Sequence, residues 1–369
     1  MRIGIDAKPL ESPDYTGIPR YLHEILRVWA KKYPDHEYYL YSTAGIHTEF
    51  ELPDNWHVVV QRPFPGFLRK LWGTIQLPVL IKKDKVDVLW AANYALPPKV
   101  SGVRYFVTVY DVALLLFRGI GTAANELKVR IMTGPACRRA EKVFTISEST
   151  AKDIVKCIKI PPSKIEVCYC GGLPQSKNVL SKGTAMHEGN YFLFVSTIEP
   201  RKNVLTLIKA FEMFLDQTGS DMDLVLVGKI GWKCEDVLRY REKSRYKDRI
   251  WMPGYVTAEE KDKLYRNAKA FVFPSLYEGF GIPVLEAFSY GLPVITANNS
   301  SLPEVGGDAA FYVQDAKNPA ELAGLMKEVT FLSEEQKNEL LRKMEKQLSK
   351  FSWDESAEKM MKVLRGVSE

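Results

Sequence analysis

Short apolar runs alternate with helical patterns along the first half of the chain. Seven of these runs have the length and composition of buried β-strands: residues 2–7, 37–43, 56–61, 86–92, 104–111, 142–147 and 165–170. Helical periodicity, as over residues 17–32, separates most of them. Strands that are apolar throughout and alternate with helices predict a parallel sheet with helices on both faces.

The alternation stops over residues 171–190, which are rich in Gly, Ser and Lys and lack periodicity, as is typical of a linker. After this segment the pattern restarts, with strand-like runs at 191–197, 223–228, 249–256, 270–275, 291–297 and 311–315, and with helices near 204–215, 235–244 and 258–268. Beyond residue 315 the chain is helical to its end. We therefore predict two doubly wound, Rossmann-like α/β units joined by a hinge, with a ligand in the cleft between them.

A length of 369 residues fits two domains. The predicted boundaries are 1–172 for the first domain, 173–190 for the linker, 191–350 for the second domain and 351–369 for a final helix. Ser352 suits the N-cap of that helix, but its own sequence leaves open which domain the helix covers.

The stretch SLYEGFGIPVLEAFSYGLPVI (275–295) places two acids, Glu278 and Glu286, around a glycine loop between two strands. Pro283 suits the first turn of the short helix between them, and Gly291 suits the position just past its end. The loop should then lie at the carboxyl edge of the sheet, where such sheets bind ligands. Carboxylates at this edge are suited to accept hydrogen bonds from hydroxyls, as on a sugar.

Two adjacent cations follow a strand in STIEPRKNVLTLI (196–208), where Arg201 and Lys202 precede a helix. Such a pair can neutralise a diphosphate, both on binding and as charge builds on a leaving group. Because cations are disfavoured at a helix N-terminus, we predict that an external anion accounts for them. A solvated helix start is the alternative.

Two other strand ends carry weaker signals. Gly17, in DYTGIPRYLHEIL (14–26), begins a helix and would permit close approach of an anion or a sugar, although a turn needs glycine equally often. The spacing G-x-G-x-x-G is missing there, which argues against a nicotinamide dehydrogenase. In MPGYVTAEEKDKLY (252–265), Thr257 suits a helix cap, and Tyr255 offers a flat surface to a nucleobase.

Composition limits the function classes. The five cysteines include no CxxC pair, and the five histidines are scattered, so we expect neither a disulfide framework nor a zinc site. No apolar run reaches the roughly 18 residues needed to span a bilayer, and the sequence beginning MRIGIDAKPL does not resemble a secretion signal. We therefore expect a cytoplasmic protein.

The net charge of +6 is unevenly distributed. Residues 1–185 contain 26 Lys and Arg against 17 Asp and Glu, whereas the remainder contains 25 against 28. The basic half indicates contact with something anionic, with uneven surface charge of no function as the alternative.

Three motifs, TIEPRKN, GYVTAEEKDKLY and the 275–295 stretch, resemble in order and spacing those of the retaining glycosyltransferases of family 4 (glycosyl transferases group 1), which have the GT-B fold. The acids Glu278 and Glu286 match that family's pair, which is separated by seven residues. Segments TGIPRY, TVYD, FTISEST and FSWDESA extend the resemblance over nearly the whole chain.

This resemblance implies an enzyme that moves a hexose from a nucleotide diphosphate sugar to a glycan or polyprenyl-linked acceptor, with no cofactor and no metal. The first domain would bind the acceptor, the second would bind the donor, and the final helix would cross back onto the first domain. The implied catalytic residues are Arg201, Lys202 and Glu278, and the implied donor contacts are Gly17, Tyr110, Asp111, Thr197, Tyr255, Val256, Gly279, Phe280, Gly281 and Glu286.

Two positions depart from the family pattern. Many relatives carry a histidine where this chain has Tyr110 beside Asp111, so the sugar's outer hydroxyl would be read differently or a deoxy or N-acetyl sugar would be used. Many also carry an arginine in place of Thr197, a charge for which Arg201 would compensate.

Retention without an obvious nucleophile indicates same-face transfer, in which a donor phosphate oxygen accepts the proton of the attacking hydroxyl. Glu278 is the candidate for a covalent nucleophile, but the family pattern favours hydrogen bonding to the sugar. A metal is not implied, because the D-x-D at Asp221–Asp223 reads as a strand boundary.

Residues 63–83 combine cations with Phe67, Leu68, Leu71 and Trp72, as an interfacial helix does, although Leu77-Pro78 interrupts the pattern. Contact with the inner face of a membrane is one interpretation, and a helix packed on the sheet is the other. Nucleic acid is not an expected partner. A GT-B epimerase, a sucrose-type synthase and a catalytically silent nucleotide-sugar-binding protein remain alternative functions.

Overall fold

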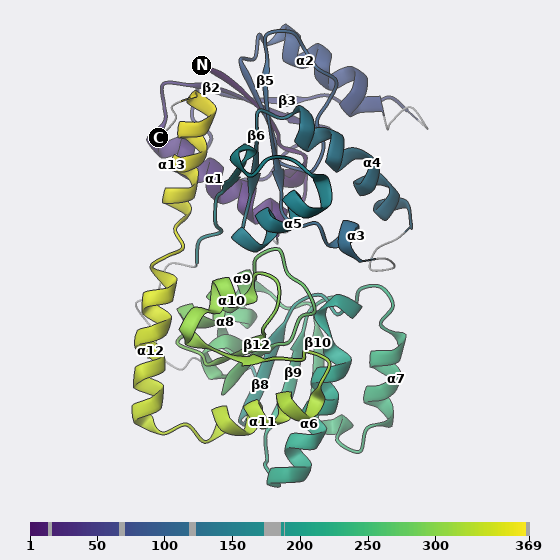
Figure 1. Cartoon of the computed structure of the whole chain (residues 1–369), viewed down its shortest axis with the longest axis vertical. Helices are drawn as coiled ribbons and strands as arrows, with labels where there is room; N and C mark the ends of the chain where they lie inside the picture. The colour runs from purple at the N-terminus through teal and green to yellow at the C-terminus, as the bar shows by residue number, and fades with distance from the viewer. Residues whose placement is uncertain (14–16, 66–70, 118–122, 173–185, 188, 367–369) are drawn as a thin grey trace. The chain divides into compact units, whose positions relative to one another are not determined.

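The computed structural model describes residues 1–13, 17–65, 71–117, 123–172, 186–187 and 189–366. The chain divides into two compact units (Figure 1). One unit comprises Met1–Cys170 together with Ser352–Glu369, and the other comprises Gly171–Phe351. Both units have the predicted α/β architecture of a parallel sheet with helical crossovers, so the predicted fold class is confirmed.

The sheet of the first unit has seven parallel strands in the order β3-β2-β1-β4-β5-β6-β7. The strands are β1 (Arg2–Asp6), β2 (Glu37–Ser42), β3 (Trp56–Val60), β4 (Val88–Ala91), β5 (Arg104–Val109), β6 (Lys142–Thr145) and β7 (Ile165–Val167). The helices are α1 (Ile18–Lys32), α2 (Leu77–Lys83), α3 (Ala113–Leu116), α4 (Ala123–Arg139), α5 (Glu148–Ile158) and α13 (Trp353–Arg365).

Helices cover both faces of this sheet. Leu89 and Ala91 of β4 belong to one core with Leu77 and Ile81 of α2, with Ala136 and Cys137 of α4, and with Ala140 directly after α4. Trp90, between them in sequence, packs instead on Trp29 of α1, with ring centroids 5.1 Å apart. Because successive strand residues point to opposite faces, α2 and α4 lie on one face and α1 on the other.

The C-terminal helix α13 packs on α1 within the first unit. The Trp29 indole donates a 2.9 Å hydrogen bond to the Ala357 carbonyl, and Lys32 pairs with both Asp354 and Glu358. The predicted Ser352 cap is present, with the side chain accepting from the Glu355 N–H. These contacts show that α13 covers the first unit, a point that the sequence of the helix itself left open.

The sheet of the second unit has six parallel strands in the order β10-β9-β8-β11-β12-β13. They are β8 (Tyr191–Val195), β9 (Asp223–Val227), β10 (Ile250–Gly254), β11 (Ala270–Phe273), β12 (Val294–Ala297) and β13 (Ala310–Val313). The helices are α6 (Val204–Thr218), α7 (Glu235–Lys243), α8 (Ala258–Asn267), α9 (Ile282–Ser289), α10 (Leu302–Gly306), α11 (Pro319–Thr330) and α12 (Glu334–Leu348).

In each sheet, the direction in which the chain adds successive strands reverses once. In the second unit the chain builds outward from β8 to β9 and β10, and then returns to place β11 on the other side of β8. The first unit does the same around β1 and β4. In sheets of this kind the crossovers on the two sides leave a crevice at the carboxyl ends of the two central strands, where ligands bind.

The end of the predicted linker is attached to the second unit. His187 lies 2.7 Å from a carboxylate oxygen of Asp223, and its ring stacks on Trp251. Residues 173–185 and 188 of the predicted linker lie outside the described residues.

The sequence left two interpretations open for residues 63–83, membrane contact and packing on the sheet. A π-helical turn, η3 (Trp72–Gln76), leads into α2, which begins at the Leu77-Pro78 pair. Trp72 is buried, and its indole donates to the Gln61 carbonyl at 2.9 Å, so at this residue the structure agrees with the interpretation of a helix packed on the sheet. Phe67 and Leu68 lie outside the described residues. None of the described helices has the length and apolar character that crossing a membrane requires.

Candidate functional site

Three charged side chains meet at the carboxyl ends of β8 and β11, the strands beside the switch point of the second unit. The Lys202 ammonium lies 2.6 Å from one carboxylate oxygen of Glu278, and the Arg201 guanidinium lies 2.9 Å from the other. The two cations belong to a 3-10 turn after β8, whereas Glu278 belongs to the loop between β11 and α9. The structure thus brings together the three residues that the resemblance assigned to catalysis.

Burial and charge act in opposite directions on the pKa of Glu278. Burial raises it, but the charges of Arg201 and Lys202 outweigh that effect and lower the pKa to about 2. Burial lowers the pKa of Lys202 from its ordinary value, and the attraction of Glu278 offsets part of this effect. At neutral pH Glu278 is therefore a carboxylate that accepts hydrogen bonds and has no proton to donate.

A second glutamate completes the charge balance. Glu199 lies 2.8 Å from the Arg201 guanidinium, so two carboxylates neutralise the two cations within the chain. The prediction that Arg201 and Lys202 need an external anion is therefore wrong. The reason is that Lys202 and Glu278 are 76 residues apart, and a local sequence pattern does not show which distant loops meet.

Backbone hydrogen bonds fix the two loops against each other. The Arg201 guanidinium also donates to the Tyr277 carbonyl at 2.8 Å, and the Leu276 N–H donates to the Arg201 carbonyl at 2.8 Å. Asn203, in the left-handed region at φ 61°, donates its side-chain amide to the Pro274 carbonyl at 3.0 Å. The cluster is thus preorganised by contacts that hold the backbone as well as the side chains.

Ser300 and Ser301, which follow β12, hold the acidic loop from the other side. The Glu278 N–H donates to the Ser300 hydroxyl at 2.9 Å. The Ser301 hydroxyl lies 2.9 Å from the Glu278 carbonyl and 2.6 Å from the Phe280 carbonyl. Sequence reasoning missed these serines, although their place directly after a predicted strand put them at the same sheet edge.

The glycine loop 279–281 leads directly into α9. Gly281 has φ 118°, a region that favours glycine, and a Cβ there would lie 3.1 Å from Leu302. The Phe280 ring is buried against Phe351, with centroids 5.4 Å apart. The Phe280 side chain is therefore part of the interior of the second unit and not a surface offered to a ligand.

Glu286 lies within α9 and is buried, with partners different from those of Glu278. The Lys261 ammonium and the Tyr265 hydroxyl, both on α8, lie 3.3 Å from its carboxylate oxygens. These distances are longer than the 2.7–2.9 Å typical of a charged hydrogen bond. The two acids of the predicted pair thus belong to separate parts of the site.

The other predicted donor residues of the second unit lie on loops after β8 and β10. Tyr255 is exposed, and the Lys229 ammonium lies 4.8 Å from its ring centroid, while Val256 beside it is buried. Thr197 is exposed and lies in the loop after β8. Arg201 does not simply replace a missing charge at Thr197, because it is already bound to Glu278 and Glu199.

Gly17, Tyr110 and Asp111 belong to the first unit. Gly17 has φ 61° and begins α1 as predicted, and Asp111 accepts from the Ala113 N–H at 2.9 Å. The Tyr110 hydroxyl donates to the Ala92 carbonyl at 2.9 Å, and burial raises its pKa well above the ordinary value. Tyr110, which the resemblance implies as a donor contact, therefore uses its hydroxyl as a hydrogen-bond donor inside the fold.

Two family models together cover most of the chain. The model described as Glycosyltransferase Family 4 matches residues 15–171, and the model described as Glycosyl transferases group 1 matches residues 176–351. The chain belongs to the group 1 glycosyltransferases. This family membership agrees with the GT-B architecture of two Rossmann-like units.

Relatives and solved structures extend this assignment. An O-antigen chain mannosyltransferase B from Escherichia coli is 32% identical over 62% of this chain and 61% of its own length. A serotype-specific mannosyltransferase WbdA from Escherichia coli is 31% identical over 59% of this chain, but the match spans only 28% of WbdA. Sucrose-phosphate synthase from Thermosynechococcus elongatus is 16% identical, with a TM-score of 0.75 over 99% of this chain and 98% of its own, which shows a shared fold.

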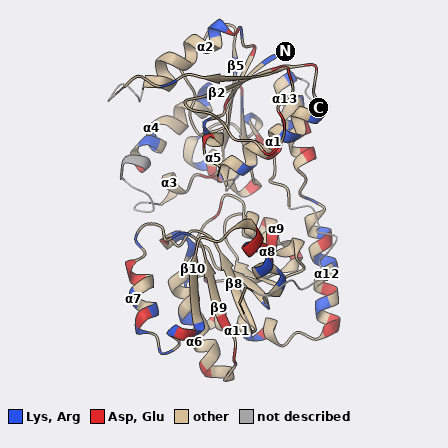
Figure 2. Cartoon of the chain, turned by 180° about the vertical axis from the view of Figure 1, so that it is seen from behind, with Lys and Arg blue, Asp and Glu red and all other residues tan. Residues whose placement is uncertain are grey.

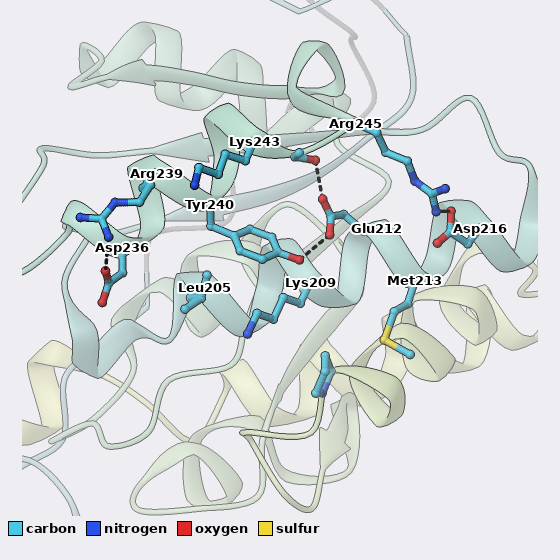
Figure 3. A pocket seen from close by; sticks show the side chains of 12 residues that line it. Leu205, Lys209, Glu212, Met213, Asp216, Asp236, Arg239, Tyr240, Lys243 and Arg245 are labelled. Atoms are coloured by element: carbon cyan, nitrogen blue, oxygen red, sulfur yellow. Dashed lines mark hydrogen bonds and ion pairs between the residues drawn. The ribbon is translucent and has the colours of Figure 1, made fainter.

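This group 1 glycosyltransferase also has a groove of about 830 Å³ between α6 and α7, apart from the charged cluster (Figure 3). Its polar side chains bind one another: Glu212 accepts from the Tyr240 hydroxyl at 2.6 Å, and Arg245 pairs with Asp216. These contacts join the two helices, so we assign the groove no ligand. In the described part of the chain, no group of three or more His, Cys, Asp or Glu side chains is arranged to hold a metal ion.

Proposed function

We propose that this protein is a retaining glycosyltransferase that moves a hexose from a nucleotide diphosphate sugar to a hydroxyl of a glycan or polyprenyl-linked acceptor. The cluster of Arg201, Lys202 and Glu278 at the switch point carries the proposal. Mannose is the proposed sugar, because the two sequence relatives described above are an O-antigen chain mannosyltransferase and a serotype-specific mannosyltransferase. Assembly of a cell-surface polysaccharide on the cytoplasmic side of the membrane is the proposed setting.

The donor diphosphate binds beside Arg201 and Lys202 in this proposal. Both cations stabilise the negative charge that develops on the leaving diphosphate. The backbone of residues 279–281 contributes at the same place, because it leads into the N-terminus of α9, where the helix dipole favours an anion. The proposal includes no metal ion.

Glu278 positions the sugar in this scheme. With a pKa of about 2 it is ionised at neutral pH, so it accepts hydrogen bonds from sugar hydroxyls and does not protonate the leaving group. Its charge is also shared between two cations, which makes it a weak nucleophile. Both properties support same-face transfer over a covalent intermediate.

In the proposed reaction, all bonds and protons are accounted for without a proton donor from the protein. The acceptor oxygen forms a bond to the anomeric carbon on the face from which the bond to the phosphate oxygen breaks. The acceptor proton moves to that phosphate oxygen, and the nucleoside diphosphate is released. The protein contributes charge stabilisation and orientation.

Glu286 and Tyr255 hold the nucleoside in this proposal. An ionised carboxylate has about four lone-pair sites, so Glu286 can accept from two ribose hydroxyls in addition to its 3.3 Å contacts with Lys261 and Tyr265. The exposed ring of Tyr255 offers a flat surface to the base, and the adjacent Val256, whose side chain is buried, remains a proposed contact. Gly17, Asp111 and Thr197 remain proposed donor contacts.

A thermal-shift panel tests the donor site. UDP, GDP, ADP, dTDP and their sugars are added in EDTA to the parent protein and to Lys202→Ala and Glu286→Ala. A ligand at 100 times its Kd adds about 2.7 kcal/mol of stability, which is readily measured. We expect one nucleotide to stabilise the parent and to lose that effect in both variants.

Lys243→Ala is the matched control, because Lys243 is an exposed lysine on α7, in the same unit. It should respond as the parent does. A panel in which no nucleotide stabilises the parent, or in which all three variants respond equally, would reject the proposed donor site. NMR of the product anomer then tests retention, and turnover without an acceptor would indicate an epimerase instead.

A further inference from the structure

Helix α4 carries apolar residues on two opposite faces. Ala136 and Cys137, at its end, and Ala140, directly after it, are buried in the core of the first unit. Leu127 and Ile131, one helical turn apart, are 59% and 61% exposed on the other face. A helix that only covers a sheet has a polar outer face, so packing on the sheet does not explain these two side chains.

Helix α2 and the π-helical turn before it repeat this arrangement. Leu77 and Ile81 are buried against the sheet, whereas Ile75 and Val79 are 47% and 63% exposed. Lys82 and Lys83, in the last turn of α2, are also exposed. The outer side of α2 therefore combines apolar side chains with cations.

The two outer sides belong to one surface of the first unit. Residues of α2 and α4 share one core on the same face of the sheet, so their outer sides point away from that face together (Figure 1). Basic residues occur on both helices (Figure 2). We name this the α2–α4 surface and define it by Ile75, Val79, Lys82, Lys83, Leu127, Lys128, Arg130 and Ile131.

The cations of the α2–α4 surface are not neutralised nearby. Within the described ranges, Lys82, Lys83, Lys128 and Arg130 form no ion pair. The sequence from 63 to 83 contains no acid, and that from 118 to 140 contains five cations and one acid, Glu126. Unpaired cations next to exposed Leu, Ile and Val match the surface of an anionic bilayer, which presents phosphate head groups above hydrocarbon.

We propose that the α2–α4 surface binds a membrane rich in anionic lipid. Leu127, Ile131 and Val79 enter the boundary between head groups and acyl chains, and Lys82, Lys83, Lys128 and Arg130 contact the lipid phosphates. Binding through these eight residues uses the outer sides of two packed helices and leaves the first sheet and its core unchanged. It requires neither a donor nor an acceptor, so it stands or fails independently of the proposed reaction.

Vesicle cosedimentation without substrates tests this proposal. The full chain should bind vesicles of phosphatidylcholine with phosphatidylglycerol more tightly than vesicles of phosphatidylcholine alone, and added salt should weaken the binding. The variant Leu127→Ser/Ile131→Ser should bind roughly tenfold or more weakly, as expected for the loss of buried Leu and Ile contacts. Lys128→Glu/Arg130→Glu should lose the preference for anionic lipid.

Matched control variants test whether the loss of vesicle binding is specific to the α2–α4 surface. They remove an exposed apolar side chain or reverse an exposed lysine elsewhere in the chain. Phe331→Ser removes a side chain that is 68% exposed in the second unit, and Lys243→Glu reverses an exposed lysine there. Both should bind vesicles as the parent does, and circular dichroism should show that all variants are folded. Absence of vesicle binding by the parent, or an equal loss in the controls, would overturn the proposal. So would a change in oligomeric state, without a change in vesicle binding, on Leu127→Ser/Ile131→Ser, since the surface would then join two copies of the chain.

Discussion

The Lys202 ammonium and the Glu278 carboxylate, 2.6 Å apart and both buried, form an ion pair across the switch point of the second sheet. Two charges taken out of water are stable only when each has good partners. Arg201 provides a second cation for Glu278 and also donates to the Tyr277 carbonyl, which fixes its side chain. This pair therefore links the stability of the second unit to its proposed chemistry.

Removing one member of this pair should destabilise the protein. We expect Lys202→Met to lower the free energy of unfolding by about 2 kcal/mol, because Glu278 keeps only Arg201 as a buried partner. The double variant Lys202→Met/Glu278→Gln should lose less than the sum of the two single variants, with a coupling of about 1–3 kcal/mol. Urea unfolding of the four proteins measures both values.

The exposed pair Lys263–Glu259, at 2.8 Å on α8, is the control. Lys263→Met should change the free energy of unfolding by no more than about 0.5 kcal/mol. Strict additivity of Lys202→Met and Glu278→Gln would show that the two side chains do not interact in solution.

Stability should depend on pH through Glu278. Its folded pKa of about 2 lies below the ordinary value of 4.5, so the stabilisation is present above pH 4.5 and is lost as the pH falls toward 2. Glu278→Gln lacks this titration. We expect the stability difference between the parent and Glu278→Gln to shrink by up to about 3 kcal/mol between pH 5 and pH 2. Urea unfolding across this range measures it, and a constant difference would contradict the low pKa.

Glu286 should affect binding more than stability. Its hydrogen bonds to Lys261 and Tyr265 are long, so Glu286→Gln should change the free energy of unfolding by less than about 1 kcal/mol. If it accepts from the ribose, the same change should weaken nucleotide binding roughly 10- to 100-fold, because a charged hydrogen bond contributes about 1.5–3 kcal/mol. Calorimetric titration with the nucleotide from the thermal-shift panel measures the affinity, and an unchanged Kd would remove Glu286 from the nucleoside site.

Gly281 should not tolerate a side chain. At φ 118°, and with Leu302 3.1 Å from the position of a Cβ, Gly281→Ala should cost about 1–3 kcal/mol. Gly324→Ala is the matched control, since no atom lies within 4 Å of its Cβ position in the middle of α11, and it should raise stability by up to about 1 kcal/mol. Thermal unfolding of both variants measures whether Gly281→Ala lowers stability and Gly324→Ala raises it. Equal shifts would show that the loop adapts to the added methyl group.

Much of the fold could be predicted from local patterns. The strand and helix segments follow from apolar runs and periodicity, and most predicted strands fall within a few residues of the observed ones. Thr257, Ser352 and Gly291 have the predicted positions at helix ends, because capping depends on neighbouring residues only. An exception is the predicted strand 165–170, of which only Ile165–Val167 pairs with β6.

The sequence by itself determined the two α/β units, the sheet edge of the site and the residues Arg201, Lys202, Glu278 and Glu286, because strand ends and their side chains are local features. Only the tertiary structure decided that Glu278 forms ion pairs with both cations, that Tyr110 bonds to Ala92, that Trp72 is buried, and that α13 packs on α1. Each of these facts depends on which segments, distant in the chain, the folded sheet brings together. The charges of Arg201 and Lys202, which the fold brings next to Glu278, in turn lower its pKa, because their attraction outweighs the opposite effect of burial.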